Sequence, residues 1–298
     1  MLMGYHTPVM VKEVVDNLVT DKSGVYVDLT FGSGGHSMAI LSRLIDGHLY
    51  AFDQDIDVER NLEDFNNFDN FTFILSNFKY LKRFMNYYGI DNVDGIFADF
   101  GVSSHQIDTP QRGFSTRFCG ELDMRMNKNS TVSAKTIVNE YSINDLHRIL
   151  AEYGELHNAA SIAKIIIEWR KTRKIETTDA LKTLILSKSI IPKKYQQKFL
   201  SQVFQALRME VNNELVVIEN MLSQAVSLLK VGGRLVTVSY HSLEDRLVKN
   251  FLRNSFSQHS PDAHGIRQLT KKTIIPSSEE IIKNPRSRSA KLRVGIKY

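Results

Sequence analysis

The sequence contains a single cysteine, Cys119, among its 298 residues. One thiol excludes an intramolecular disulfide and any zinc site with several cysteine ligands, and it suits a reducing cytosol. Long apolar runs are also missing: none approaches the ~18 residues that a membrane-spanning helix requires, and the N-terminus lacks the apolar core of a signal peptide. We therefore expect a cytoplasmic protein with no bound metal and no membrane partner.

The rest of the composition is ordinary except for its charge. Hydrophobic residues make up 42% and charged residues 24% of the chain, as in soluble globular proteins. A chain of this length holds one large domain or two modest ones. The formal net charge of +5 and the pI of about 9.1 indicate a polyanionic partner.

Three glycines within four residues mark a sharp turn near the N-terminus. An apolar, β-branched run at residues 25–30 stops at Gly32, Gly34 and Gly35, and a helical pattern follows at once. Glycine lets the backbone approach a ligand closely. The next apolar run ends in Asp53, ~20 residues further on, where Rossmann-type domains bind ribose hydroxyls. The pattern predicts a nucleotide site, although a tight strand–helix turn without a ligand stays open.

Short apolar runs alternate with helical patterns through much of the chain. Strands are expected at residues 25–30, 49–52, 71–75, 93–98 and 234–239. Such alternation predicts a parallel sheet, whose ligands bind beyond the carboxyl ends of its strands. Asp53, Phe78, Asp99 and Tyr240 follow four of these runs, so we expect them at one edge. Residues 290–298 alternate like a last, edge strand.

A long helical region separates the fourth and fifth predicted strands. No strand-like run occurs from residue 143 to residue 207, where Lys and Arg are frequent. We therefore predict a discontinuous α/β domain at residues 1–108 and 211–298, and a helical domain inserted at residues 109–210. The cations of the insert form either a solvated helix surface or a polyanion-binding one. Helices are also expected at residues 55–67 and 211–229.

Eight short motifs spread over the chain match one family. They are His6-Thr-Pro-Val9, Asp28-Leu-Thr-Phe-Gly-Ser-Gly-Gly-His36, Asp99-Phe-Gly-Val-Ser-Ser104, Arg112-Gly-Phe-Ser115, Leu122-Asp-Met-Arg-Met126, Phe204-Gln-Ala-Leu-Arg208, His241-Ser-Leu-Glu-Asp-Arg246 and Asn284-Pro-Arg-Ser-Arg-Ser289. Together they closely resemble the RsmH (MraW) family of bacterial methyltransferases. Members use S-adenosylmethionine (SAM) to modify the exocyclic N4 of a decoding-centre cytidine in 16S ribosomal RNA.

The resemblance implies a fold, a cofactor and a partner. The fold is a class I SAM-dependent methyltransferase (Rossmann-like) sheet with an inserted all-helical domain, which we expect to recognise RNA. The cofactor is SAM, the partner is the 16S rRNA of the small ribosomal subunit, and a homodimer is left open. The cofactor contacts that carry over are Gly34, Gly35, His36, Asp53, Phe78, Asp99 and Gln106.

The chemistry of these residues suits the implied roles. Asp53 can accept hydrogen bonds from both ribose hydroxyls, and Phe78 can pack on the adenine ring. Asp99 is placed either to neutralise part of the cationic methionine end of SAM or to lie beside the incoming base. Without the resemblance, His36 fits a helix-start residue equally well.

Methyl transfer to an amine depends on alignment more than on covalent catalysis. The cytosine amine is a weak nucleophile because its lone pair is delocalised into the ring, and an acceptor at the amino hydrogens helps to localise it. Asp99 or a neighbouring backbone carbonyl is the candidate acceptor, and Tyr240 is the candidate ring for stacking on an extracted base. Methylation of carbon 5 normally needs a cysteine thiolate instead, and Cys119 lies in the predicted insert.

Three positions depart from the family pattern. Residues 120–123 read Gly-Glu-Leu-Asp rather than Gly-Pro-Leu-Asp, and residues 199–204 lack the arginine of the usual Pro-Ala-Thr-Arg-Thr-Phe. We therefore assign no RNA contact to that second stretch. Tyr240 replaces a phenylalanine and keeps the ring.

Two other functions fit parts of the pattern. A catalytically silent RNA-binding assembly factor would keep this fold for its shape, and labelled methyl incorporation into small-subunit RNA would distinguish it. A nicotinamide-dependent dehydrogenase would explain a glycine turn followed by Asp53, but the spacing lacks the third glycine of G-x-G-x-x-G. Titration with SAM and with NAD separates that alternative.

Overall fold

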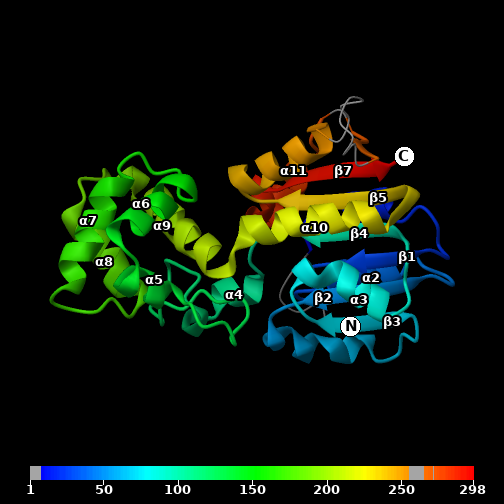
Figure 1. Ribbon diagram of the computed structural model, residues 1–298, viewed down its shortest axis with the longest axis horizontal. Helices are drawn as coiled ribbons and strands as arrows, with labels where there is room; N and C mark the ends of the chain where they lie inside the picture. The colour runs from blue at the N-terminus through cyan, green and yellow to red at the C-terminus, as the bar shows by residue number, and fades with distance from the viewer. Residues whose placement is uncertain (1–7, 255–264, 271) are drawn as a thin grey trace. The chain divides into compact units, whose positions relative to one another are not determined.

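The computed structural model describes residues 8–254, 265–270 and 272–298. The contacts between residues divide the chain into two compact units (Figure 1). Met1–Gly101 and Leu215–Tyr298 form the first unit, and Val102–Glu214 form the second. Among the described residues, none of the helices combines the length and the apolar character that crossing a bilayer requires.

A seven-stranded sheet forms the centre of the first unit. The strands are β1 (Val25–Asp28), β2 (His48–Asp53), β3 (Phe71–Leu75), β4 (Val93–Asp99), β5 (Leu229–Ser239), β6 (Ile266–Gln268) and β7 (Lys291–Lys297). Their order is β3-β2-β1-β4-β5-β7-β6, and β7 runs antiparallel to the other six strands. The strand order reverses between β1 and β4, which is where open parallel sheets bind ligands. The predicted class I methyltransferase fold with a helical insert is confirmed.

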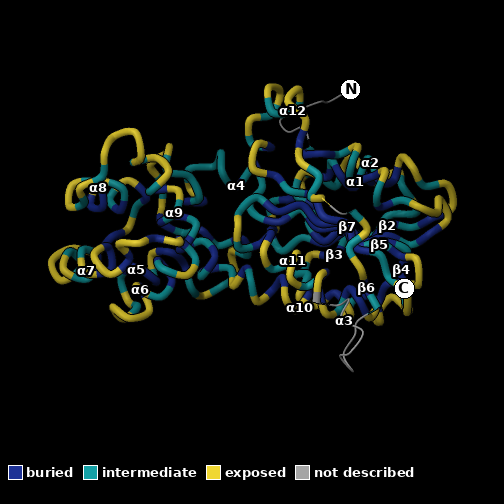
Figure 2. Tube along the Cα trace, turned by 90° about the horizontal axis from the view of Figure 1, so that it is seen from above, coloured by how far each residue is buried: buried dark blue, intermediate teal, exposed yellow. Residues whose placement is uncertain are grey.

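Helices cover both sides of the sheet, and each side has its own apolar core (Figure 2). One layer consists of α1 (Val11–Leu18), α2 (Gly35–Leu41) and the 3-10 helix η1 (Ile56–Phe65). The other layer consists of the 3-10 turn η2 (Phe78–Tyr80), α3 (Leu81–Tyr87), α10 (Glu214–Leu228) and α11 (Ser242–Asn254). Val14 and Leu18 are buried in the first core, whereas Met85, Met221 and Leu252 are buried in the second. The strands between them therefore read as continuous apolar runs rather than alternating ones.

The second unit is helical. Its helices are α4 (Ser104–Asp108), α5 (Ala134–Glu140), α6 (Ile143–Glu152), α7 (Ala159–Arg170), α8 (Thr178–Lys188) and α9 (Lys193–Asn212). Leu146, Ile162 and Leu207 come from three of these helices and are fully buried in one cluster, so the unit has a core of its own. The unit includes α4, and α9 extends to Asn212, so the unit is longer at both ends than the insert predicted at residues 109–210.

Two of the sequence motifs have a structural role in the second unit. The buried guanidinium of Arg112 donates to the backbone oxygens of Arg125 and Met126, at 2.8 and 3.1 Å. Gly113 has φ +72°, and a Cβ there would lie 2.2 Å from the backbone oxygen of Glu121. These motifs hold two loop segments against each other.

Three predicted elements differ from the structure. Residues 56–65 form a 3-10 helix rather than an α-helix. The helix predicted at residues 211–229 is interrupted at Asn213, whose φ of +50° ends α9 before α10 begins. The prediction of an edge strand at residues 290–298 is wrong, because β6 pairs along the outer side of β7. A three-residue strand is too short to show an alternating pattern, so β6 was missed.

Candidate active site

The glycine turn after β1 leaves no room for larger side chains. Gly34 has φ +79°, in the left-handed region, and directly precedes α2. A Cβ on Gly34 would lie 2.7 Å from Cε2 of Phe65, and one on Gly35 would lie 2.8 Å from Cγ of Pro8. Contacts this short do not occur between real side chains, so both positions require glycine. Packing of Phe65 and Pro8 against the turn thus explains both glycines.

Asp53, the last residue of β2, ties this turn to the neighbouring strand. Its Oδ2 accepts a hydrogen bond from the Gly32 N–H at 2.8 Å, and its Oδ1 accepts from the Asp55 N–H at 2.9 Å. Each carboxylate oxygen can accept a further bond, so the group can still receive two ligand hydroxyls. Burial raises the pKa of Asp53 to about 6, against the lowering effect of these two backbone bonds.

Asp28, the last residue of β1, organises the same turn from inside. Its Oδ2 accepts from the Ser37 hydroxyl at 2.7 Å, and its Oδ1 accepts from the Thr30 N–H at 3.0 Å. The Thr30 hydroxyl in turn accepts from the Asp99 N–H at 2.7 Å. Asp28 is fully buried, and this burial raises its pKa to about 6. The ends of β1 and β4 are therefore held together through Thr30.

Asp99 lies at the carboxyl end of β4 and meets residues from three other segments. The Tyr240 hydroxyl is hydrogen-bonded to its carboxyl group, and His36 Nδ1 lies 3.8 Å from its Oδ2. Its Oδ1 is buried without a hydrogen-bond partner among the described residues. Burial raises the pKa of Asp99 to about 8; the Tyr240 bond opposes this, and the charges of Asp28 and Glu244 add to it. At neutral pH the ligand-free group is thus largely a neutral acid.

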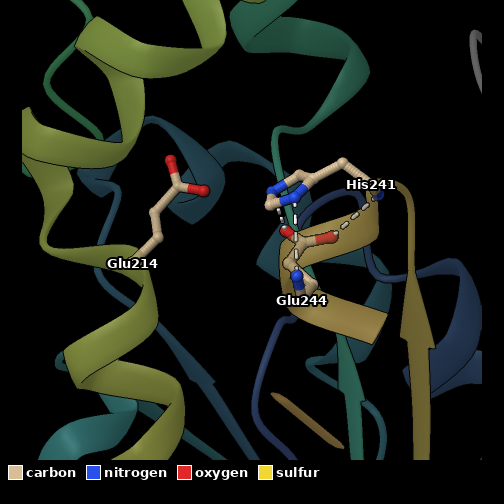
Figure 3. A group of neighbouring side chains, drawn as sticks. All are labelled: Glu214, His241 and Glu244. Carbon is tan, nitrogen blue, oxygen red and sulfur yellow. Dashed lines mark hydrogen bonds and ion pairs between the residues drawn. The ribbon is translucent and has the colours of Figure 1, made fainter. Parts of the chain in front are cut away.

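Glu244 fixes the segment that carries Tyr240. Its Oε2 accepts from the backbone N–H groups of Tyr240, at 2.8 Å, and His241, at 3.3 Å. Figure 3 shows the His241 ring beside this carboxylate, in the first turn of α11, with Nε2 3.1 Å from Oε1. Glu244 is fully buried. Glu214, also drawn in Figure 3, belongs to the second unit, where its carboxylate accepts bonds of 2.7 and 2.8 Å from Arg208.

The carboxyl groups at this edge repel one another. The charge of Asp28 raises the pKa of both Asp53 and Asp99, and the charge of Glu244 raises the pKa of Asp99 further. A cationic ligand relieves such repulsion and favours the ionised forms. The edge of the sheet is therefore suited to a ligand that combines hydroxyl groups with positive charge.

The remaining expected site residues lie in different surroundings. His36 is buried in the first turn of α2, with Nε2 2.9 Å from the Val9 oxygen and its ring against Phe97. Phe78 opens η2 and is half-buried; a 2.7 Å bond from Asn77 to Gln54 ties its segment to the one after Asp53.

Gln106 belongs to the second unit. It lies on α4, where its buried side chain accepts from the Ser103 N–H at 3.1 Å and completes a capping box.

Two residues of this network were missed at the sequence level. Asp28 stands inside an apolar run, where a carboxylate that must be buried is itself a signal. Glu244 precedes a second acidic residue, Asp245, which pairs with Arg293 at 2.7 Å, and the sequence does not distinguish their roles.

Comparisons with known proteins agree with this geometry. The model of the MraW methylase family matches residues 3–298. Ribosomal RNA small subunit methyltransferase H of Flavobacterium johnsoniae is 49% identical to the chain, over 99% of the chain and 98% of the relative. The protein of the same name from Christiangramia forsetii is 50% identical, over 99% of both. Because the family model matches nearly the whole length and relatives of this name are about half identical, the chain belongs to the MraW methylase family of methyltransferases.

Proposed function

We propose that the chain methylates the N4 amino group of a decoding-centre cytidine in the 16S rRNA of the small subunit, with SAM as methyl donor, in the cytoplasm. The observation that carries this is the acidic edge of the sheet. There a buried oxygen of Asp99, beside Tyr240 and the glycine turn, has no hydrogen-bond partner among the residues that the structure describes. The curated relatives carry the name of a small-subunit ribosomal RNA methyltransferase, which supports the substrate class.

The residues at the edge of the sheet fit SAM. Asp53 would accept hydrogen bonds from the ribose hydroxyls, and Phe78 would pack on the adenine ring. At Gly34 and Gly35 the backbone would approach the ligand closely. The family resemblance implies His36 and Gln106 as further contacts. The coupled carboxyl groups would attract the positive charge of the ligand. When bound, SAM supplies an electrophilic methyl group on a sulfonium.

Asp99 and Tyr240 are the residues that we assign to the target base. Bound positive charge favours the carboxylate form of Asp99, which can then accept a hydrogen bond from the cytosine amine through Oδ1. Such a bond localises the nitrogen lone pair. The product amine loses a proton. Asp99 is suited to receive it, because burial raises the pKa of its carboxyl group to about 8. Tyr240, hydrogen-bonded to Asp99, would present its ring to the base.

Nitrogen methylation is favoured over carbon methylation by the position of the single thiol. Carbon 5 of cytosine requires a covalent nucleophile at carbon 6, normally a cysteine. Cys119 is exposed and lies in the helical unit, whereas the first unit contains no cysteine in its sequence. An exocyclic amine needs no such nucleophile.

We assign RNA recognition in part to the helical insert. Between Asp179 and Glu210 the sequence contains no acidic residue. The end of α8 and the first turns of α9 expose four lysines and a tyrosine: Lys188, Lys193, Lys194, Tyr195 and Lys198. Lys194 lies 4.7 Å from the Tyr195 ring centre, an arrangement that suits phosphate and base contacts together.

The C-terminal tail, residues 271–298, is rich in Lys and Arg, but several of its cations, and others of the insert, form ion pairs or hydrogen bonds within the protein. In the insert, Lys171 pairs with Glu168, and Lys182 pairs with Asp179. In the tail, Lys283 pairs with Glu279, Lys291 and Arg293 pair with Asp245, and Lys297 bonds to the Val226 oxygen. Lys271 lies outside the described residues. We therefore give the tail a smaller part in RNA binding than its sequence indicates.

The test is incorporation of labelled methyl from SAM into small subunits, followed by digestion of the RNA and mass spectrometry of the nucleosides. We expect N4-methylcytidine, and we expect Cys119→Ser to transfer methyl at nearly the wild-type rate. Detection of 5-methylcytidine would overturn the proposed chemistry. Binding of subunits and SAM without any transfer would instead favour the silent assembly factor.

A further inference from the structure

The two helical layers of the first unit differ in the charge that they expose. The helices η2, α3, α10 and α11 expose six cations and a single carboxylate, Glu219. The six, which we call the basic face, are Lys79, Lys82, Arg83, Arg246, Lys249 and Arg253. The other acidic side chains of α11, Glu244 and Asp245, are buried.

The opposite layer has the reverse balance. Its helices α1 and η1 expose four carboxylates, Asp16, Glu59, Glu63 and Asp64, and two cations, Lys12 and Arg60. The net basic charge of the chain therefore does not explain the basic face. Among these helices, exposed positive charge is therefore concentrated on η2, α3, α10 and α11.

Most cations of the basic face have no internal electrostatic role. Lys82, Arg83, Lys249 and Arg253 form no ion pair with the residues that the structure describes. In the opposite layer, Lys12 pairs with Asp16, as does Arg43 in the turn after α2, whereas Arg60 has no ion pair with the described residues. Like charges held on one surface repel each other, and a bound polyanion removes that cost.

The helices that carry these cations are anchored by core packing and by side-chain hydrogen bonds. Leu81 and Met85 of α3, and Val248 and Leu252 of α11, are almost completely buried in the same core. The Gln224 side chain of α10 links α3 to its neighbour through two hydrogen bonds. It donates to the Lys79 oxygen at 2.8 Å and accepts from the Lys82 N–H at 2.9 Å. The cations are therefore presented by packed helices, on one side of the sheet (Figure 1).

The exposed aromatic residues of this layer fit a nucleic acid better than a protein. Tyr80 is 43% exposed, with Lys79 4.9 Å from its ring centre, and Tyr87 is 79% exposed. Tyrosine beside lysine or arginine is typical of surfaces that contact phosphates and unpaired bases. Protein interfaces usually have an apolar centre depleted of charge. Lys82, Arg83 and Asn86 occupy the exposed positions between these two tyrosines.

We propose that the basic face binds the phosphate backbone of ribosomal RNA, as a second contact surface that is distinct from the site of the target base. This inference rests on the proposed function for the identity of the RNA. Each cation that contacts a phosphate would release counterions, so the contribution of the face should depend on salt.

The test compares two variants with equal change in net charge. One carries Lys82→Gln, Arg83→Gln, Lys249→Gln and Arg253→Gln on the basic face. The control carries Lys12→Gln, Lys22→Gln, Arg43→Gln and Arg60→Gln, all at exposed positions outside this layer. Binding of protein-free 16S RNA and of small subunits is measured over a range of salt concentrations. SAM affinity and the melting temperature verify that both variants are folded.

We expect the basic-face variant to bind both forms of RNA about tenfold or more weakly near physiological salt, and the control to bind within about threefold of the wild type. The slope of log affinity against log salt should be shallower by roughly 0.7–0.9 for each lost phosphate contact. In turnover, the KM for subunits should rise while kcat is retained.

Equal effects of the two variants, or no effect of either, would overturn the inference. A loss confined to whole subunits, with unchanged binding of protein-free RNA, would also overturn it, because it would identify a ribosomal protein as the partner. If the wild type methylates cytidine N4 and the basic-face variant is unchanged, only this inference fails. If the wild type transfers no methyl to subunits, the proposed function fails.

Discussion

Asp99 is the residue at which the interactions of the acidic edge meet. Its backbone N–H is bound by Thr30, its carboxyl by Tyr240, and its Oδ1 is without a partner in the described part of the chain. Burial, together with the charges of Asp28 and Glu244, raises its pKa to about 8. A cationic ligand beside it must therefore drive off a proton at neutral pH.

This proton release can be measured. We expect SAM binding to the wild type to release a proton near pH 7. Below the pKa of Asp99, the SAM affinity should therefore increase by up to about tenfold for each unit by which the pH is raised. Calorimetry in buffers of different ionisation enthalpy gives the proton count. The amino group of SAM titrates in the same range, so the difference between the wild type and Asp99→Asn is the decisive quantity. Equal proton release by the two proteins would contradict the assignment.

Asp53 has two roles that a pair of substitutions can separate. We expect Asp53→Ala to weaken SAM binding by roughly 10- to 100-fold, because hydrogen bonds to a charged group are worth ~1.5–3 kcal/mol. Asp53→Asn keeps one acceptor oxygen for the Gly32 or the Asp55 N–H and should lose less. Unchanged SAM affinity in the alanine variant would remove Asp53 from the cofactor site. A lower melting temperature in that variant alone would report the lost bonds to the turn.

The sequence predicted site residues where a polar side chain follows an apolar run. Asp53, Asp99 and Tyr240 all stand at the ends of strands, as expected. Asp28 was not singled out, because it lies inside the apolar run rather than after it. Its role depends on the Thr30 N–H and the Ser37 hydroxyl, which only the folded turn brings near. The roles of Asp53, Asp99 and Tyr240 in binding and catalysis are predictions that the experiments described here test.

At the scale of elements, the turn between β1 and α2 is the most constrained segment. Gly34 combines a left-handed backbone with a Cβ position 2.7 Å from Phe65. Gly89 has a similar φ of +72°, but nothing lies within 4 Å of its Cβ position. The two glycines therefore share a backbone requirement and differ in the space around them.

This difference makes Gly89→Ala a control for Gly34→Ala. Both variants should lose stability of about 1–2 kcal/mol from the left-handed backbone. Only Gly34→Ala should in addition displace Phe65 and the turn, and abolish SAM binding as measured by titration. Melting temperatures show whether each variant is folded. Retention of wild-type SAM affinity by Gly34→Ala would show that the turn does not contact the cofactor.

Elements were predictable where one pattern extended over enough residues. The five strands with long apolar runs and the helical character of the insert followed directly from periodicity. The break at Asn213 did not, because apolar residues continue in helical spacing across it while its φ of +50° separates α9 from α10. β6 was missed because three residues are too few to show a periodic pattern, and its pairing with β7 depends on the tertiary fold.

At the scale of the whole molecule, the acidic edge affects folding stability. The folded-state pKa values of Asp28, Asp53 and Asp99, about 6, 6 and 8, all lie above the ordinary value of 3.8. The folded state thus binds more protons than the unfolded state between these limits. Stabilisation by these groups is complete below pH ~4 and is lost as pH rises through 6 and then 8.

We therefore expect the contribution of these groups to lower the melting temperature of the ligand-free protein from pH 6 to pH 8.5. Asp99→Asn should flatten the upper part of that decline, because the amide does not ionise. SAM should raise the melting temperature more at pH 8 than at pH 6. Melting curves recorded in parallel for the wild type and the variant decide the matter: identical pH profiles would mean that Asp99 is ionised in the same range in both the folded and unfolded states.

The discontinuity of the sheet has a consequence for synthesis of the chain. β4 ends at Asp99 and its parallel neighbour β5 begins at Leu229, so the whole second unit is translated between two strands that must pair. Val102–Glu214 is continuous in sequence and has its own core, so it can fold as soon as it leaves the exit tunnel. The first four strands must wait, with the β5 side of β4 unpaired, until β5 emerges. Since β7 then inserts between β5 and β6, the nascent enzyme acquires its finished sheet only when residues 291–297 have been added.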